Sequence, residues 1–242
     1  TLKISTVSLM ASNSSDNKYR RPVRSYVIRS GRLTESQRKA ITSYWADYVV
    51  EFLPQPLDLN SLFPQIAPVS LEIAFVMGSS LLTMAQQAPE KNFLGIEVHR
   101  PGIGKVLHEI ENLGIKNLKL ICQDAKEVID ENIPDSTIER ILMLFPDPWP
   151  KKRHNKRRLV QPEFIEKLST KLQPDGLLHL ATDWQPYAEH MMEVLEANAS
   201  LQNQNGAGNY SQSPERPRTK FEARGERLGH GVWDLLYRKS VA

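Results

Sequence analysis

The sequence has few of the features that mark secreted, metal-binding or membrane proteins. Cys122 is its only cysteine, so an intramolecular disulfide is excluded and a thiolate zinc site is not expected. The six histidines show no metal-ligand spacing. No apolar run approaches the roughly 20 residues of a membrane span, and residues 1–10 lack the basic-then-apolar pattern of a secretory signal. We therefore predict a cytoplasmic protein with no metal and no membrane segment.

Glycine is scarce in the turn where a nucleotide-binding sheet most needs it. The apolar run 69–75 is typical of a buried strand, and the stretch from Glu72 onward offers only Gly78. A dinucleotide-binding turn uses several glycines, for tight backbone angles and for close approach of the ligand. The missing GxGxxG fingerprint argues against a nicotinamide-dependent oxidoreductase, one of the hypotheses considered.

Positive charge is concentrated in three segments. The net charge is only +3 at pH 7, yet cations gather in residues 18–32, 151–158 and 216–227, and the middle of the chain is neutral to acidic. Basic segments around a neutral core indicate an anionic macromolecule that is held at several places.

The chain alternates between short apolar runs and helical patterns. Residues 1–33 predict a flexible basic arm and residues 34–242 one folded domain that begins with a helix over 34–52. A polar loop is expected over 198–218 and an edge strand over 231–239. Such alternation predicts an α/β fold with a mainly parallel sheet and helices on both faces. The predicted strands are 69–75, 93–98, 118–122, 138–145 and 176–182, and the predicted helices are 79–88, 103–113, 125–131, 163–172 and 186–196.

A carboxylate lies in or just beyond each of the five predicted parallel strands. Ligands of open parallel sheets bind beyond the carboxyl ends of the strands, where an acid after the second strand can hold a ribose diol. One such acid is often only a helix cap, and Asp124 stands directly before a predicted helix. Five in register indicate a nucleoside-bearing cofactor. The five are Glu72, Glu97, Asp124, Asp147 and Asp183.

Residues 144–158 join a strand end to the densest basic cluster. Pro146 and Pro148 stiffen the backbone around Asp147, because proline fixes its own φ and restricts the residue before it. Trp149 offers a face on which a base can stack, and the cations after it can bind phosphates. A solvated basic surface or a localisation signal would explain the cations alone, but not the rigid Pro-Asp-Pro-Trp before them. The segment indicates an RNA substrate beside the cofactor.

From Arg21 to Lys239 the sequence resembles the bacterial tRNA (guanine-N7-)-methyltransferases. The Phe-Pro-Asp-Pro-Trp motif at 145–149 and the Thr-Lys-Phe-Glu motif at 219–222 are specific to that family. The resemblance implies a class I methyltransferase fold, S-adenosylmethionine as cofactor, and methylation of N7 of the variable-loop guanosine at tRNA position 46. Further matching motifs lie at 24–26, 31–34, 93–99, 153–158, 181–184 and 229–234.

The resemblance also implies roles for individual residues. Asp147 would be catalytic. The chemistry of N7 methylation, which leaves the base positively charged, separately leads us to expect that either Asp147 or Asp183 stabilises that charge. The partner would be tRNA, and a monomer or a homodimer would fit, with the monomer preferred. The cofactor would be held by Glu72, Gly78, Glu97, Asp124 and Asp147. The substrate nucleoside would contact Lys151, Asp183, Thr219, Lys220, Phe221 and Glu222. RNA would contact Arg153, His154, Asn155, Lys156, Arg157 and Arg158.

The sequence departs from the family pattern Glu-Ile-Gly-Phe-Gly-Met-Gly in the first turn. Ala74 and Val76 stand where the pattern has glycines. Val76 is β-branched and resists a positive φ, and both side chains would lie near the cofactor. This leaves, as an alternative, a tRNA-binding protein of the same fold with weak or no catalysis.

Overall fold

The computed structural model describes residues 24–26, 31–212, 215–218, 222 and 231–240, so most of the predicted arm lies outside the described residues. The helices of this part are α1 Glu35–Tyr48, α2 Ser79–Gln87, α3 Arg100–Leu113, α4 Ala125–Glu131, α5 Pro162–Lys171 and α6 Gln185–Glu196, with 3-10 helices η1 Leu59–Leu62 and η2 Lys152–Arg157. The strands are β1 Val49–Val50, β2 Val69–Ile73, β3 Asn92–Ile96, β4 Leu118–Ile121, β5 Ile138–Leu144, β6 Leu172–Thr182, β7 Leu201–Asn203 and β8 Trp233–Lys239.

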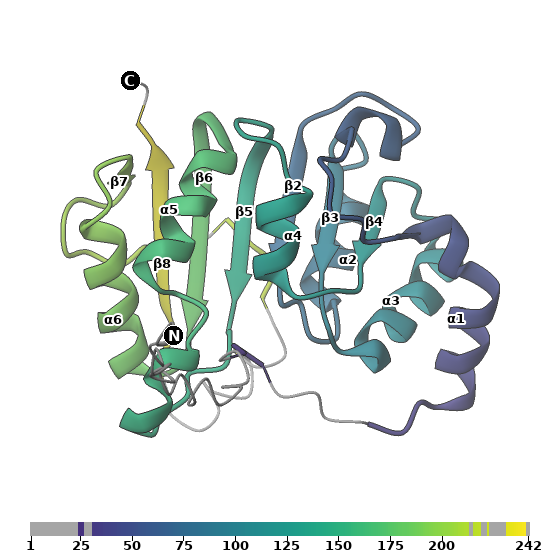
Figure 1. The fold of residues 1–242 in the computed structure, drawn as a ribbon, viewed down its shortest axis with the longest axis horizontal. Helices are drawn as coiled ribbons and strands as arrows, with labels where there is room; N and C mark the ends of the chain where they lie inside the picture. The colour runs from purple at the N-terminus through teal and green to yellow at the C-terminus, as the bar shows by residue number, and fades with distance from the viewer. Residues whose placement is uncertain (1–23, 27–30, 213–214, 219–221, 223–230, 241–242) are drawn as a thin grey trace, which may run out of the picture.

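The strands of the described residues form one mostly parallel sheet in the order β1-β4-β3-β2-β5-β6-β8-β7. Strands β1 to β6 pair in parallel, whereas β8 runs antiparallel to β6 and β7 antiparallel to β8. In Figure 1 the arrowheads of β5 and β6 accordingly point in one direction and that of β8 points in the opposite direction. The predicted α/β fold with its mainly parallel sheet is confirmed.

The strand order reverses between β2 and β5. The chain steps outward from β2 to β3 and β4, and then returns to place β5 on the other side of β2. The carboxyl ends of β2 and β5 are therefore followed by loops that leave in opposite directions. Such a switch point opens a crevice, which is where ligands of doubly wound sheets bind.

Helices cover both faces of the sheet. One hydrophobic cluster joins β2, β5 and β6 to α4, α5 and α6, and a second joins β3 and β4 to α1, α2 and α3. Strand β2 is buried along its whole length, as expected for a strand covered on both sides. Figure 1 shows α1 and α3 side by side at one end of the sheet and α6 at the other. Within the described part of the chain, no helix has the length and apolarity that a membrane crossing requires.

The loop predicted over 198–218 is partly wrong, because it contains β7. Leu201 is buried against the main cluster, and Gln202 and Asn203 pair with β8. The polar side chains of this short edge strand conceal it in the sequence, since its pairing depends on the backbone of a distant partner.

Candidate active site

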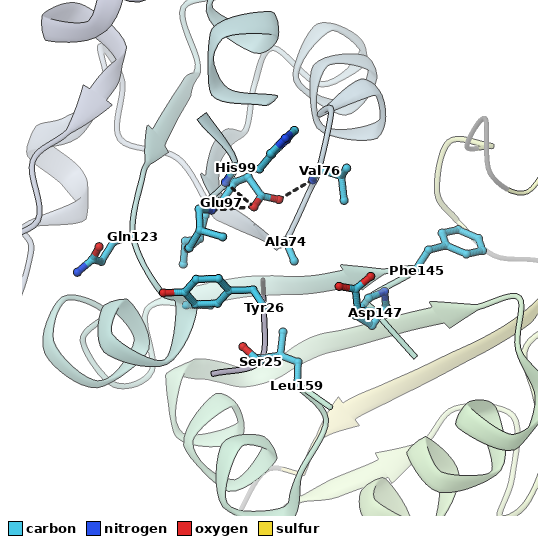
Figure 2. Close-up of a pocket in the computed structure, with 14 residues that line it drawn as sticks. Ser25, Tyr26, Ala74, Val76, Glu97, His99, Gln123, Phe145, Asp147 and Leu159 are labelled. Carbon is cyan, nitrogen blue, oxygen red and sulfur yellow. Dashed lines mark hydrogen bonds between the residues drawn. The ribbon is translucent and has the colours of Figure 1, made fainter. Parts of the chain in front are cut away.

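A cavity of about 270 Å³ opens at the carboxyl ends of the central parallel strands. Figure 2 shows Gln123 at one end of this cavity and Phe145 with Asp147 at the other. Between them, Glu97 follows β3 on one side, and Tyr26 lies across from it. The cavity therefore occupies the switch point of the sheet, with an acid on its wall and another at its end.

The turn after β2 adopts the backbone angles that normally call for glycine. The φ angles are 59° at Ala74, 53° at Val76 and 67° at Gly78. The Val76 N–H donates to Glu97 Oε2 at 2.8 Å, and the Val76 carbonyl oxygen packs so closely on Gly102 that a Cβ there would lie 1.8 Å from it. Contacts on both sides thus hold a β-branched residue in a left-handed conformation that costs about 1–2 kcal/mol.

Glu97 braces this turn through its carboxylate. Besides Val76, the backbone N–H groups of Val98 and His99 donate to Glu97 Oε1 at 2.7 and 2.9 Å. The side chain is buried, which raises its pKa, while the three backbone hydrogen bonds oppose that shift. A carboxylate offers about four acceptor positions, so one position remains for a ligand hydroxyl.

A second cavity, of about 250 Å³, adjoins the first and contains Glu72. Val76 and Phe145 line both cavities and therefore stand where the two meet. Glu72 Oε1 accepts a hydrogen bond from Ser80 Oγ at 2.6 Å, but Oε2 is buried with no hydrogen-bond partner among the described residues. Burial without a counter-ion raises the pKa of Glu72 to about 7. Gly78, also in the lining, begins α2 in a left-handed conformation.

Asp124 acts as a helix cap in this structure. Its Oδ1 accepts a hydrogen bond from the Lys126 N–H at 2.9 Å at the start of α4. Its chain neighbours, Gln123 and Ala125, are the residues that line the cavity. The capping alternative raised by the sequence is therefore confirmed, and the role of Asp124 in cofactor binding stays a prediction.

The loop after β5 brings Asp147 to the cavity and carries strain on both sides of it. Phe145 and Trp149 have φ angles of 56° and 45°. The Trp149 Nε1–H donates to the carbonyl oxygen of Ser25 at 3.1 Å, which ties Ser25 and Tyr26 to the cavity wall. We did not predict these two residues as site residues, although they belong to the Arg-Ser-Tyr motif at 24–26.

The predicted substrate residues differ in their exposure and contacts, and three of them lie outside the described part of the chain. Lys151 is exposed at the start of η2, and Asp183 is half-buried just after β6. Glu222 forms an ion pair of 2.7 Å with Arg216, whose guanidinium lies 5.4 Å from the Phe145 ring centroid. The predicted residues 219–221 lie outside the described part of the chain.

The side chains of the predicted RNA-binding segment, residues 153–158, differ in their exposure to solvent. Arg153 and Lys156 are exposed, and His154, Asn155 and Arg157 are half-buried. The Arg157 guanidinium covers one face of Trp149, 4.6 Å from the ring centroid. Arg158 is only 5% exposed, which sets it apart from the solvated cationic surface that the charge pattern suggests. Among the described residues, no cluster of three or more His, Cys, Asp or Glu side chains is arranged to hold a metal ion.

Comparisons with known proteins identify the family. The family model described as "Putative methyltransferase" matches residues 66–235. The tRNA (guanine-N(7)-)-methyltransferase of Aeromonas hydrophila subsp. hydrophila is 51% identical over 93% of this chain and 95% of its own length. The protein of the same name from Shewanella amazonensis is 52% identical over 93% and 94%.

Two solved structures share the fold at low identity. The 16S rRNA methyltransferase KamB is 16% identical, with a TM-score of 0.54 over 76% of this chain and 93% of that one. An rRNA methylase from Streptococcus thermophilus is 12% identical, with a TM-score of 0.50 over 72% and 88%. The fold is thus that of the class I methyltransferases. The family model and the two sequence relatives show that the chain belongs to the family of bacterial tRNA (guanine-N7-)-methyltransferases.

Proposed function

We propose that this protein transfers the methyl group of S-adenosylmethionine to N7 of the guanine at position 46 of tRNA. The observation that carries the proposal is the position of Asp147. It lines the cavity at the switch point and lies four residues before the cationic segment that begins at Lys151. One loop therefore joins a small-molecule site to a surface suited to phosphates. The names of the relatives supply the substrate.

The residues around the two cavities fit S-adenosylmethionine. Glu97 would accept a hydrogen bond from the ribose at its remaining acceptor position, and Gln123 lies at the end suited to the adenine. The unpartnered Oε2 of Glu72 would receive the α-ammonium group, which would supply the missing counter-charge. When bound, the cofactor supplies an electrophilic methyl group on a sulfonium.

Methylation of N7 requires little proton transfer by residues of the protein. N7 of guanine carries a free lone pair, so it would accept the methyl group without prior deprotonation and no residue of the protein has to act as a general base. The main task of the protein is alignment. The methylated ring becomes positively charged, and the carboxylate of Asp147 at the cavity end would stabilise that charge as it develops. Asp183 would orient the guanine edge.

The remaining predicted residues would bind tRNA around this centre. Arg153, Lys156 and Lys151 are exposed next to the Asp147 loop and would meet phosphates. Residues 219–222 would contact the guanine base. The proposal places the protein in the cytoplasm with its tRNA. The comparisons give no support to the alternative of a tRNA-binding protein with weak catalysis.

Replacing Asp147 tests its role. The isosteric Asp147→Asn variant keeps the side-chain shape but removes the charge, so kcat should fall about 10²-fold or more, the size of effect seen when an electrostatic stabiliser is lost. Affinity for tRNA should stay within about two-fold. Asp130→Asn, on the exposed end of α4, is the matched control and should leave kcat unchanged. Full turnover by Asp147→Asn with normal tRNA binding would remove Asp147 from the mechanism.

A further inference from the structure

Arg158 faces a different direction from the cations that precede it. Its guanidinium packs between two aromatic side chains at the start of α6, 5.5 Å from the Trp184 ring centroid and 5.0 Å from that of Tyr187. With 5% of the residue exposed, an RNA phosphate has no access to the charge. Burial also lowers the pKa of this group, although an arginine remains charged at physiological pH.

The buried guanidinium binds the loop that carries Asp147. Arg158 Nε donates to the carbonyl oxygen of Pro148 at 3.0 Å, and Pro148 directly follows Asp147. Asn155 adds a second tie, because its side-chain nitrogen, oriented as a donor, lies 3.2 Å from the Trp149 carbonyl oxygen. The Arg158 N–H in turn donates to the Asn155 carbonyl oxygen at 3.0 Å. Two residues of the cationic motif thus point inward.

The loop needs such ties because its backbone is strained. Left-handed residues stand on both sides of Asp147, at Phe145 and Trp149. Strain of this kind persists only where surrounding contacts hold it. A charged donor on the Pro148 carbonyl is one of the stronger hydrogen bonds available in a protein, and the packing on Trp184 and Tyr187 fixes its direction.

We propose that Arg158 is a positioning residue: its buried guanidinium holds the Pro148 carbonyl and thereby keeps Asp147 at the cavity, and it makes no contact with RNA. The inference rests on the proposed function, in which Asp147 takes part in methyl transfer. It divides the motif at 153–158 into exposed residues that meet tRNA and an inward pair, Asn155 and Arg158, that shapes the active-site loop.

Two substitutions separate positioning from phosphate binding. Arg158→Lys keeps the charge but loses the planar donor geometry, and Arg158→Met keeps buried volume but loses the charge. We expect kcat at saturating tRNA and S-adenosylmethionine to fall at least ten-fold in both, with the Kd for tRNA within two-fold of wild type. The dependence of log Kd on log salt concentration should also be unchanged. Lys156→Met, from the exposed part of the motif, should weaken tRNA binding and reduce that slope by about 0.7–0.9.

Thermal unfolding confirms that each variant is folded, and calorimetric titration with S-adenosylmethionine gives the cofactor concentration needed for saturation. The proposal is overturned if Arg158→Lys retains the wild-type kcat while Arg158→Met shows weaker tRNA binding with a smaller salt slope. Loss of folding in both variants would also overturn it, because Arg158 would then support the whole fold. If wild type itself transfers no methyl group, the proposed function fails instead, and the salt slopes still decide whether Arg158 contacts RNA.

Discussion

Replacing Ala74 and Val76 together by glycine is expected to tighten S-adenosylmethionine binding and to stabilise the protein. Both residues have positive φ, and the Val76 side chain stands where the two cavities meet. The double variant Ala74→Gly/Val76→Gly relieves the backbone strain and joins the two spaces. The two effects can be measured separately. Backbone strain lowers the stability of the protein with and without ligand, whereas the volume of the Val76 side chain affects only the affinity for the ligand.

The stability gain follows from the backbone. A left-handed conformation costs a non-glycine residue about 1–2 kcal/mol, and substitution by glycine removes this cost. The greater freedom of glycine in the unfolded chain lowers the free energy of unfolding by about 0.4–1 kcal/mol and so offsets part of the gain. The net gain is roughly 1 kcal/mol per position, or about 2 kcal/mol for both. With an unfolding entropy of about 2.1 cal/mol/K per residue, 242 residues give about 0.5 kcal/mol/K and a rise in Tm of about 4 °C.

The affinity gain follows from the space that Val76 occupies. Moving or straining one side chain to admit a ligand costs about 1 kcal/mol, which corresponds to about five-fold in Kd. Calorimetric titration with S-adenosylmethionine measures it. Ser136→Gly is the matched control, since Ser136 has a φ of 56° in the turn before β5, at the amino end of this strand and so at the opposite end from the cavity. It should raise Tm and leave Kd unchanged. Equal affinities of the double variant and the parent would show that the Val76 side chain does not hinder cofactor binding.

Two further predictions concern the cavity walls. Because burial raises the pKa of Glu72 from 4.5 to about 7, the folded state without cofactor binds a proton more tightly than the unfolded state, and stability should fall by roughly 3 kcal/mol as the pH rises from about 4.5 through 7. Denaturant unfolding of Glu72→Gln should lack this fall, and parallel pH curves for both proteins would contradict it. Trp149→Phe keeps an aromatic side chain but removes the indole N–H that donates to the Ser25 carbonyl oxygen, so calorimetry should show S-adenosylmethionine binding weakened about five-fold, or about 1 kcal/mol. Trp45→Phe on α1 is its control, and an equal loss in both would count against a specific role for the Ser25 contact.

The sequence predicted the sheet because the parallel strands are continuous apolar runs separated by amphipathic helices. The predicted ends of helices and strands were wrong where proline or glycine interrupts the apolar pattern. Helix α3 begins at Arg100, three residues before the expected start, since proline fits the first turn of a helix. Strand β6 begins at Leu172 rather than 176, because Pro174 and Gly176 interrupt the apolar pattern.

The sequence located site residues that follow the ends of parallel strands. It did not reveal the role of a residue whose function depends on which way its side chain points. The strand ends located Glu97 and Asp147 at one cavity. The inward turn of Arg158 could not be seen, because its aromatic partners lie on α6, more than 25 residues along the chain. Similarly, the carboxylate of Glu97 accepts a hydrogen bond from the backbone N–H of Val76, and only folding brings those two residues together.

Methylation of N7 at one guanine can be tested at the level of that atom. Two tRNAs are prepared that differ only at position 46, one with guanosine and one with 7-deazaguanosine, which carries carbon in place of N7. The protein is incubated with each and with labelled S-adenosylmethionine. We expect stoichiometric label in the first tRNA, recovered as 7-methylguanosine, and none in the second. Equal labelling of both, or no labelling of either by a protein that binds tRNA and cofactor, would contradict this expectation.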